Sequence, residues 1–302
     1  MFPVKKSNLW SRAGIIQSIR RFFINQGFLE VETPILIPQP IPEAHIDLLS
    51  TSRGFLHPSP EACMKRLLST GFPRIFQICK CFRDGERGHL HLPEFTLLEW
   101  YRADADYNAL MADCEAMIGF VSDDLGLGKT IQYRGQKIDL QPPWNRIAVE
   151  EAFAAHSPVS LREALDTDRL EEMMVINIEP NLDMSRPVFL YDYPSQFASL
   201  SRVKQDRPDL AERFELYIGG LELANAFSEL TNPDEQETRF NKENGVREKR
   251  GKKPYPVPMK FLDALHTMPP SAGIAFGVDR LVMLLTGAEK IDDVVAYTPE
   301  EL

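Results

Sequence analysis

The sequence lacks a long apolar run. No stretch approaches the roughly 20 consecutive apolar residues that a membrane-spanning helix requires. The first residues, MFPVKKSNLW, also lack the apolar segment and small-residue cleavage site of a secretion signal. We therefore expect a cytoplasmic protein with no membrane partner.

Cysteine is scarce. The chain contains Cys63, Cys79, Cys81 and Cys114, and only Cys79 and Cys81 lie close together, on a predicted strand. No second Cys-x-x-Cys or His-x-x-x-His half completes a zinc-binding pattern. Because cytosolic cysteines are usually reduced, we expect these four to be buried thiols.

Basic residues are outnumbered by acidic ones, 34 against 44, and the formal net charge is −10. Such a surface repels nucleic acid unless a local basic patch overrides it. One candidate patch exists, with six basic residues between Lys242 and Lys253. Two interpretations stay open, a solvated helix end with its loop or a docking surface for an acidic partner.

Composition otherwise indicates a globular protein with a sizeable core, since 43% of the residues are hydrophobic and 26% are charged. The strands and helices do not alternate regularly, so we predict an α+β fold, an antiparallel sheet with helices packed on it. Residues 1–302 are expected to form one domain, with a small helical insertion at about 144–181. The predicted helices are 9–23 (capped by Ser7 or Asn8), 61–69, 107–125, 239–249 and 279–285, and the predicted strands are 28–31, 74–83, 95–101, 215–226 and 273–277. Residues between 31 and 60 are proline-rich and predicted to be irregular.

A predicted hairpin carries the first candidate site. Arg83 ends one strand and Phe95 begins the next, across a polar loop. Arginine can make paired hydrogen bonds to a phosphate, and an aromatic ring offers a face to adenine. Long loops between strands are often functional, although an ordinary surface arginine would fit this pattern as well.

An acidic strand carries the second candidate site. Side chains alternate along a strand, so Asn225, Phe227 and Glu229 would share one face. Glu215 and Glu222 could meet only across a break or bulge, for which Gly219-Gly220 is the candidate. Carboxylates that gather without basic partners are costly unless they hold Mg²⁺ or a cationic ligand.

A glycine-rich turn, Gly273 to Arg280, carries the third candidate site. Glycine allows close approach of a ligand, and an arginine at a helix start adds its charge to the positive end of the helix dipole, which suits a phosphate. A second glycine-rich segment, Gly126 to Thr130, resembles the end of a P-loop. It has Asp123 where that motif needs glycine, so we predict an ordinary turn there.

Together and in this order, these pieces resemble the three signature motifs of class II aminoacyl-tRNA synthetases, over nearly the whole chain. Gln26 to Pro34 is similar to the first motif, the arginine hairpin to the second and Gly273 to Arg280 to the third. Ser59-Pro60-Glu61, Pro93 to Tyr101 and Glu222 to Glu229 are similar to the lysyl branch of the family.

The resemblance implies a set of roles around ATP, Mg²⁺ and an amino acid. It implies a homodimer whose interface includes the first motif, and an enzyme that forms a lysyl-adenylate with catalytic arginines Arg83 and Arg280. The implied ATP contacts are Arg83, His91, Phe95 and Arg280, with Mg²⁺ bound by Glu215 and Glu222. The implied amino-acid contacts are Asn225 and Arg83 for the carboxylate, Glu61 and Glu99 for the backbone-side amine, and Tyr101 and Glu229 for the side-chain ammonium.

The chain is also similar to truncated members of this branch, the ligases that attach (R)-β-lysine to a lysine of translation elongation factor P. Shared details are Trp100-Tyr101-Arg102, Tyr191 to Pro194 and Gly277 to Met283. The chain begins about where the catalytic domain of a lysyl-tRNA synthetase starts, so we expect no anticodon-binding domain and no selection of tRNA. Ala275 stands where tRNA-charging enzymes usually have glycine, and one added methyl beside the amine can favour the β-amino isomer.

Two departures from the family pattern keep other functions open. Gly85 replaces an acid, which follows one place late as Glu86, and Leu92 replaces an asparagine. These changes would weaken contacts to ATP. The alternatives to ligation onto elongation factor P are therefore tRNA charging and a catalytically weakened regulator that binds lysine or ATP.

Overall fold

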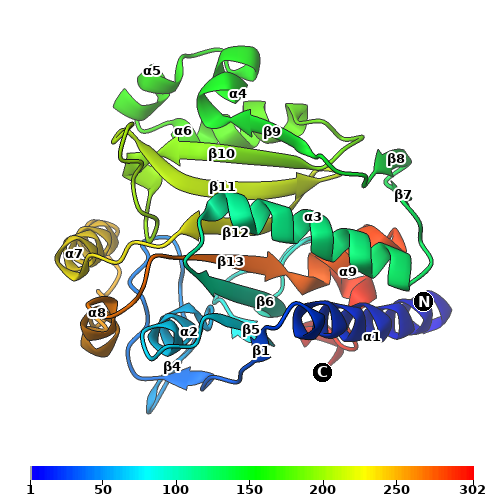
Figure 1. Ribbon diagram of the computed structural model, residues 1–302, viewed down its shortest axis with the longest axis horizontal. Helices are drawn as coiled ribbons and strands as arrows, with labels where there is room; N and C mark the ends of the chain where they lie inside the picture. The colour runs from blue at the N-terminus through cyan, green and yellow to red at the C-terminus, as the bar shows by residue number, and fades with distance from the viewer. Residues whose placement is uncertain (1) are drawn as a thin grey trace.

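The computed structural model describes residues 2–302, and the burial of side chains from Val4 onward. An eight-stranded sheet crosses the molecule (Figure 1). In spatial order its strands are β1 (Leu29–Glu30), β5 (Arg74–Phe82), β6 (Glu94–Ala103), β13 (Ser271–Gly277), β12 (Leu221–Ser228), β11 (Leu210–Ile218), β10 (Val188–Pro194) and β9 (Asn145–Ala148).

The inner pairs of this sheet are antiparallel, which confirms the predicted α+β class. Both edge strands differ, because β1 pairs with β5 and β9 with β10 in parallel. Parallel neighbours require a long crossover connection, and both edge strands have one. The sequence showed the long connections but not that their ends lie side by side.

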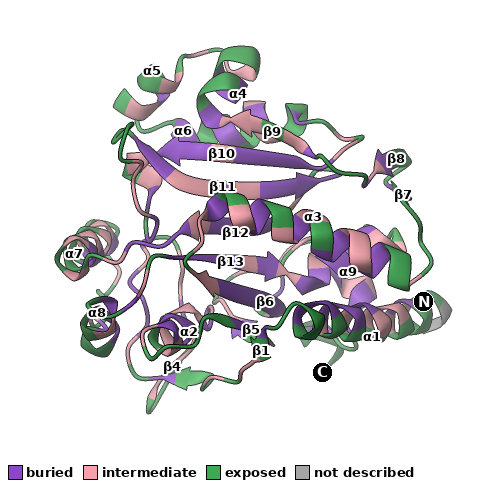
Figure 2. Cartoon of the chain, in the orientation of Figure 1, coloured by how far each residue is buried: buried purple, intermediate pink, exposed green. Residues whose placement is uncertain are grey.

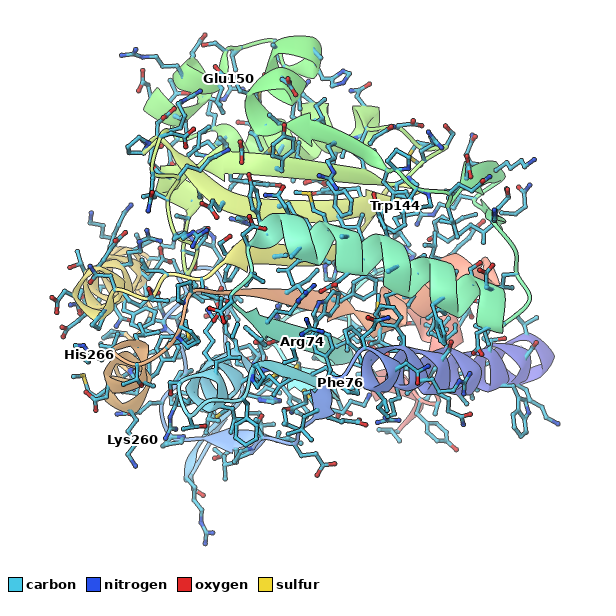
Figure 3. All side chains as sticks on the ribbon, viewed as in Figure 1. Arg74, Phe76, Trp144, Glu150, Lys260 and His266 are labelled. Atoms are coloured by element: carbon cyan, nitrogen blue, oxygen red, sulfur yellow. The ribbon has the colours of Figure 1, made fainter. Side chains whose placement is uncertain are left out.

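One face of the sheet is covered by α1 (Phe2–Asn25), α3 (Tyr107–Asp124) and α9 (Val278–Thr286), and the main core lies between them (Figures 1 and 2). Phe76 of β5, labelled in Figure 3, stacks on Phe23 of α1 with ring centroids 4.9 Å apart. Trp100 and Phe276, from β6 and β13, are also fully buried there. Because side chains alternate along each strand, the neighbouring positions face the opposite side.

Helix α1 begins earlier than predicted. The proposed caps Ser7 and Asn8 lie inside the helix, and Asn8 donates a hydrogen bond to the Asp293 carbonyl at 3.1 Å. Pro3 lies in the first turn, where backbone N–H groups have no acceptor within the helix. Proline therefore loses no hydrogen bond there, and its fixed φ suits a helix. The capping prediction was therefore wrong, although the helix itself was confirmed.

The opposite face of the sheet is covered in part by α2 (Glu61–Leu68), α7 (Pro233–Lys249) and α8 (Met259–Leu265). Helix α7 starts six residues before the prediction, since Asn232 caps it by accepting from the N–H groups of Asp234 and Glu235. The connection before α2, predicted to be irregular, contains a three-stranded sheet of β2 (Leu36–Ile37), β3 (Ser50–Thr51) and β4 (Gly54–Leu56).

Helices occupy most of the segment 144–181, at the top of Figure 1. They pack on β10 and β11 through a hydrophobic cluster of their own. β9 opens the segment and extends the main sheet. The elements are α4 (Val149–His156), α5 (Leu161–Asp166), α6 (Leu170–Met173), a π turn (Met174–Ile178) and a 3-10 turn (Glu179–Asn181).

The segment after α3 confirms the predicted turn at Gly126 to Thr130, since it leads into a small hairpin and not into a phosphate-binding helix. The hairpin consists of β7 (Thr130–Tyr133) and β8 (Gln136–Asp139), and the remaining 3-10 turns are Ser195–Phe197, Ile291–Val294 and Pro299–Glu301. None of the helices in residues 2–302 combines the length and apolarity needed to cross a bilayer.

The acidic stretch forms two strands where one was predicted. Gly219 and Gly220 have φ of +58° and +76° and connect β11 to β12 in a two-residue hairpin turn. The pairing register then shifts between Leu216 and Tyr217, which marks a β-bulge. Because of the turn and the bulge, Glu222 opposes Tyr217 and Asn225 opposes Glu215, so these polar residues share one face.

Candidate active site

Two adjoining cavities lie on the face of the sheet opposite to α1, α3 and α9. Arg83, Asn225, Ala275 and Glu43 line both. The first has a volume of about 290 Å³ and the second about 190 Å³. The residues predicted for ATP and those predicted for the amino acid are therefore next to each other, with Arg83 between them.

The first cavity gathers residues of the second and third family-like motifs and of the acidic strand β12. Besides the shared residues, it is lined by Glu86, His91, Phe95, Glu222 and Arg280. The Arg280 guanidinium donates to the Glu222 carbonyl at 2.6 Å and contacts His91 Nε2 at 2.6 Å. Burial and the Arg280 charge lower the pKa of His91, so its neutral ring accepts this bond. This arrangement places two arginines and a histidine around one opening.

Arg83 is held at the mouth of both cavities. Its guanidinium lies 5.1 Å from the centroid of the Phe95 ring, and its side chain is 30% exposed. Arg83 Nε is buried and has no hydrogen-bond partner among residues 2–302. A buried donor without an acceptor is costly, so this atom indicates an anionic ligand.

The loop between β5 and β6 accounts for two departures from the family pattern. Gly85 has a φ of +75°, which lets the chain turn so that Glu86 lines the first cavity, 3.8 Å from Arg83. An acid therefore remains beside Arg83 although it is one residue late in sequence. Leu92 is only 4% exposed and joins the main core, so at this position packing has replaced a polar contact.

The two predicted metal ligands occupy different positions. Glu222 lines the first cavity, whereas Glu215 lies behind Asn225 and lines neither cavity. Glu215 accepts hydrogen bonds of 2.7 Å from Tyr193, Tyr217 and Arg213. Burial and the charge of Glu215 raise the pKa of Glu222, and a bound cation would relieve that repulsion.

The second cavity is lined with acids and hydroxyls, including Ser59, Glu61, Glu99 and Tyr101. Glu99 is fully buried and accepts hydrogen bonds from Tyr101, at 2.8 Å, and from Ser59. Burial and the charge of Glu61 raise the pKa of Glu99 far above its usual value. An ammonium group placed there would compensate both carboxylates.

Glu229 does not line the second cavity directly. Lys65, which is 1% exposed, forms ion pairs with both Glu229 and Glu61. Gly273 allows this packing, because a Cβ at position 273 would lie 2.2 Å from Tyr101 Cε1 and 2.4 Å from Glu229 Oε1. Glu229 therefore forms the charged floor behind Tyr101, with Lys65 as its resident partner.

Three residues of the site were missed from the sequence. Lys65 follows Glu61 by four residues on a predicted helix, so the i, i+4 pairing was a usable signal. Arg213 precedes Glu215 by two residues and therefore shares its strand face. Glu43 gave no signal, because it lies in the proline-rich connection, and burial together with the charge of Glu61 raises its pKa to about 7.

The basic stretch near the end of α7 is only in part a solvated helix end. The Arg247 side chain is 5% exposed, stacks 3.9 Å from the centroid of Tyr255 and donates to the carbonyls of Glu43 and Ile46. Lys252 pairs with Asp47. The interpretation as solvated charge was therefore wrong for Arg247 and Lys252, which fix the segment that carries Glu43. The other basic residues of the stretch, Lys242, Lys249, Arg250 and Lys253, are exposed.

Comparison with known proteins covers almost the whole chain. The family model for tRNA synthetases class II (D, K and N) matches residues 2–301. The chain belongs to this family. Class II synthetases generally use ATP and Mg²⁺, and the first cavity has the arginines and carboxylates that such ligands require.

Individual relatives within the family are similar over most of their length. The chain is 39% identical over 306 residues to the elongation factor P (R)-β-lysine ligase of Histophilus somni (strain 2336), covering 96% of this chain and 94% of that protein. It is 38% identical to the enzyme of that name from Yersinia enterocolitica (serotype O:8 / biotype 1B) and 39% identical to the one from Salmonella arizonae, with the same coverage. Both comparisons bear out the resemblance found in the sequence.

Proposed function

We propose that this class II synthetase activates lysine or (R)-β-lysine with ATP and transfers the acyl group to a lysine of elongation factor P. The observation that carries the proposal is that Arg83 lines both cavities. An in-line attack of a carboxylate on the α-phosphate needs a cation where the two reactants meet. The names of the relatives support the ligase activity and the acceptor.

In the first cavity, Phe95 would stack on adenine, while His91 and Arg280 would contact the outer phosphates. Arg83 would bind the α-phosphate and stabilise the charge that develops on it as the carboxylate oxygen attacks and pyrophosphate leaves. Mg²⁺ would be held at Glu222 and Glu215 and would neutralise phosphate charge. Glu215 would then exchange part of its present hydrogen bonding for the metal.

In the second cavity, Asn225 and Arg83 would bind the amino-acid carboxylate, and Glu61 and Glu99 the adjacent amine. The side-chain ammonium would lie toward Tyr101 and the Glu229–Lys65 pair. With ammonium groups bound beside them, ionised Glu61, Glu99 and Glu229 exceed the single resident lysine by two negative charges, which matches a ligand with two ammonium groups.

Acyl transfer requires a neutral amine on the acceptor. The acceptor nitrogen attacks the carbonyl carbon of the adenylate, AMP leaves, and a proton is lost from the amine. Glu43 lines both cavities and also a wider groove that opens beside α7. It is therefore placed to receive that proton, with a pKa suited to neutral pH.

The acceptor is tested by two paired assays. Pyrophosphate exchange with lysine and with (R)-β-lysine measures adenylate formation, and transfer is then measured to elongation factor P and to lysine tRNA. We expect exchange with at least one isomer and transfer to elongation factor P only. Efficient tRNA acylation would favour the tRNA-charging alternative, and the absence of any exchange would favour the regulator.

We also propose that the protein is a cytoplasmic homodimer that pairs through the region of the first motif, with residues 1–302 acting as one catalytic domain. Large apolar side chains are exposed in and beside this region, with Ile24 57%, Leu29 48% and Leu36 42% accessible. Exposed large apolar side chains gathered in one region favour an interaction site there. Equilibrium sedimentation would measure the mass directly.

Replacement of Ala275 by glycine is expected to shift the choice of isomer. Ala275 lines both cavities and pairs with Asn225 on one side and Glu99 on the other. Its methyl group therefore borders the space for the amine. The ratio of kcat/KM for lysine to that for (R)-β-lysine should rise about 5- to 150-fold, or 1–3 kcal/mol, in Ala275→Gly. An unchanged ratio would show that the methyl group does not discriminate.

Glu43→Gln is expected to change the pH dependence of transfer. A carboxyl group whose pKa is raised to about 7 is protonated below that pH and becomes a base above it. The same acceptor amine is used with both enzymes, so its own titration cancels in the ratio of the wild-type to the Glu43→Gln transfer rate. The pH dependence of this ratio therefore reports the titration of Glu43 alone. We expect the ratio to rise between pH 6 and 8 and then to level off.

The matched control for this experiment is Glu243→Gln. Glu243 lines the groove beside Glu43 but neither cavity, and it accepts a hydrogen bond from the Ala44 N–H. Removing its charge lowers the pKa of Glu43, so the pH dependence should persist with a lower midpoint. A flat ratio across the whole range for Glu43→Gln would remove Glu43 from the transfer step.

A further inference from the structure

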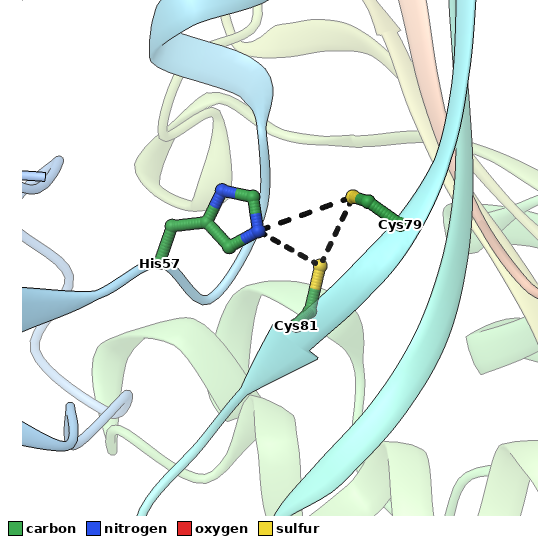
Figure 4. A group of neighbouring side chains, drawn as sticks. All are labelled: His57, Cys79 and Cys81. Carbon is green, nitrogen blue, oxygen red and sulfur yellow. Dashed lines mark hydrogen bonds between the residues drawn. The ribbon is translucent and has the colours of Figure 1, made fainter. Parts of the chain in front are cut away.

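Two thiols and an imidazole meet beside the active site, in a cluster that the proposed function does not use. Cys79 and Cys81 lie at alternate positions of β5 and therefore project from the same face (Figure 4). His57 approaches them from the segment after β4, and its ring is directed at both sulfur atoms (Figure 4). Together, the three side chains form a group that could hold a metal ion.

The three potential ligand atoms form a nearly equilateral triangle. Cys79 Sγ, Cys81 Sγ and His57 Nε2 are each 3.9 Å from the other two. A cation at the centre of this triangle would lie about 2.3 Å from each atom, close to the Zn–S distance of about 2.3 Å and the Zn–N distance of about 2.0–2.1 Å. No side chain would have to move far to coordinate it.

The cluster is buried and its backbone is fixed. His57 is 1% exposed and Cys81 is fully buried, while Cys79 is half-buried and leaves a path for an ion. The His57 carbonyl accepts from the Phe82 N–H at 3.0 Å, and the His57 N–H donates to the Ile35 carbonyl at 2.9 Å. Ligands held on such a frame lose little freedom when they bind a metal.

Polar atoms around the cluster lack partners. His57 Nδ1 and Gln77 Oε1 are buried without a hydrogen-bond partner within the described chain, and Gln77 precedes Cys79 on the same face of β5. His57 Nε2 now donates to the Lys80 carbonyl at 2.8 Å. When Nε2 binds a cation, the ring proton moves to the unpartnered Nδ1, and the Lys80 carbonyl or a water can provide the fourth ligand.

A disulfide fits this geometry less well. The sulfur atoms are 3.9 Å apart, against about 2.05 Å in a disulfide. Residues two apart on an extended strand have Cα atoms about 6.6 Å apart, at the upper end of the range that a disulfide spans. The imidazole would moreover have no role in it.

We propose that His57, Cys79 and Cys81 form a binding site for a thiophilic divalent cation of the zinc type. Thiolate and imidazole are the ligands that zinc prefers, and two thiolates balance its charge. Binding releases the two thiol protons to solvent and changes no oxidation state. The ion would tie β5, which leads to Arg83, to the segment that leads to Ser59 and Glu61.

The site can be tested without any assay of activity. Reduced, metal-free protein is titrated with Co²⁺, which gives an intense near-ultraviolet charge-transfer band only when thiolates coordinate it. We expect the band to saturate at one ion per chain and to disappear when Zn²⁺ displaces the cobalt. Cobalt at Glu215 and Glu222 would give no such band, because its ligands there are oxygen atoms.

Matched variants locate the ligands. Cys79→Ser and Cys81→Ser should each weaken Co²⁺ binding at least tenfold and reduce the band, whereas Cys63→Ser, a half-buried thiol of α2 outside the cluster, should leave both unchanged. Far-UV circular dichroism checks that each variant is folded. A band that survives in the Cys79→Ser, Cys81→Ser double variant would overturn the proposal.

The unaltered chain provides a second measurement in case a variant does not fold. One equivalent of Zn²⁺ should slow alkylation of Cys79 at least tenfold and leave the rate at Cys63 unchanged. Equal rates at Cys79 with and without Zn²⁺, together with no cobalt band, would show that the cluster is only a packed group of thiols.

Discussion

Arg83→Ala should reduce pyrophosphate exchange by a factor of 10³ or more. Arg83 lies where the two cavities meet, and its buried Nε has no acceptor among residues 2–302. Removing one donor to a developing anionic charge typically costs about 10²–10³ in rate, and a guanidinium offers several. The loss should fall mainly on kcat, because the interaction strengthens as charge develops on the phosphate.

The fold of Arg83→Ala should be almost unaffected. The side chain is 30% exposed, and the substitution removes mainly its stacking on Phe95, worth about 0.5–1 kcal/mol. Arg83→Lys keeps the charge but not the paired donors, so it should recover only part of the activity. A variant that exchanges pyrophosphate within tenfold of the wild-type rate would exclude Arg83 from the chemical step.

Arg87→Ala is the matched control for this prediction. Arg87 lies in the same loop but binds Glu300 and Asp292 and lines neither cavity. Its removal should leave exchange within about threefold of wild type. A loss as large as that of Arg83→Ala would mean that both variants act through the loop's conformation.

Glu229→Gln should raise KM for the amino acid about 100-fold and change KM for ATP less than threefold. Glutamine keeps the shape of the side chain but removes one of the negative charges that balance the ligand's ammonium groups. Losing one partner of a buried charge interaction costs several kcal/mol. The cost is reduced here because Lys65 stays paired with Glu61 when Glu229 is replaced. Equal increases in both KM values would indicate general damage to the site.

Glu235→Gln controls for the loss of a glutamate elsewhere. Glu235 pairs with Arg239 on the surface of α7, where its side chain is 42% exposed. We expect no measurable change in either KM, since exposed ion pairs contribute little. Thermal unfolding of both variants would show whether the effect of Glu229→Gln on KM is separate from an effect on stability.

The sequence predicted much of this fold because its elements have strong local signals. The hairpin of β5 and β6 was visible as two apolar runs around a polar loop, and α2, α3 and α9 as periodic segments bounded by turns. The parallel edge strands β1 and β9 were not predicted as such, since pairing between distant segments leaves no local mark.

The departures in the second motif illustrate the same limit. Judged by residue order alone, the site lacks an acid, because Gly85 stands at the position of one. The turn that Gly85 permits nevertheless brings Glu86 to within 3.8 Å of Arg83. The basic residues near the end of α7 have the pattern of free surface charge, yet Arg247 is buried against Tyr255. In both cases the outcome depended on backbone direction, which the order of residue types does not contain.

The resemblance to the family motifs was enough to predict which kinds of side chain line the two cavities, because it implied ligand contacts for Arg83, Phe95, Asn225 and Arg280. Three features emerged only once the chain was folded: Lys65 neutralises part of the acidic floor, Glu43 borders both cavities, and His57 meets Cys79 and Cys81. These contacts join segments on different elements, and their geometry depends on how the whole chain packs.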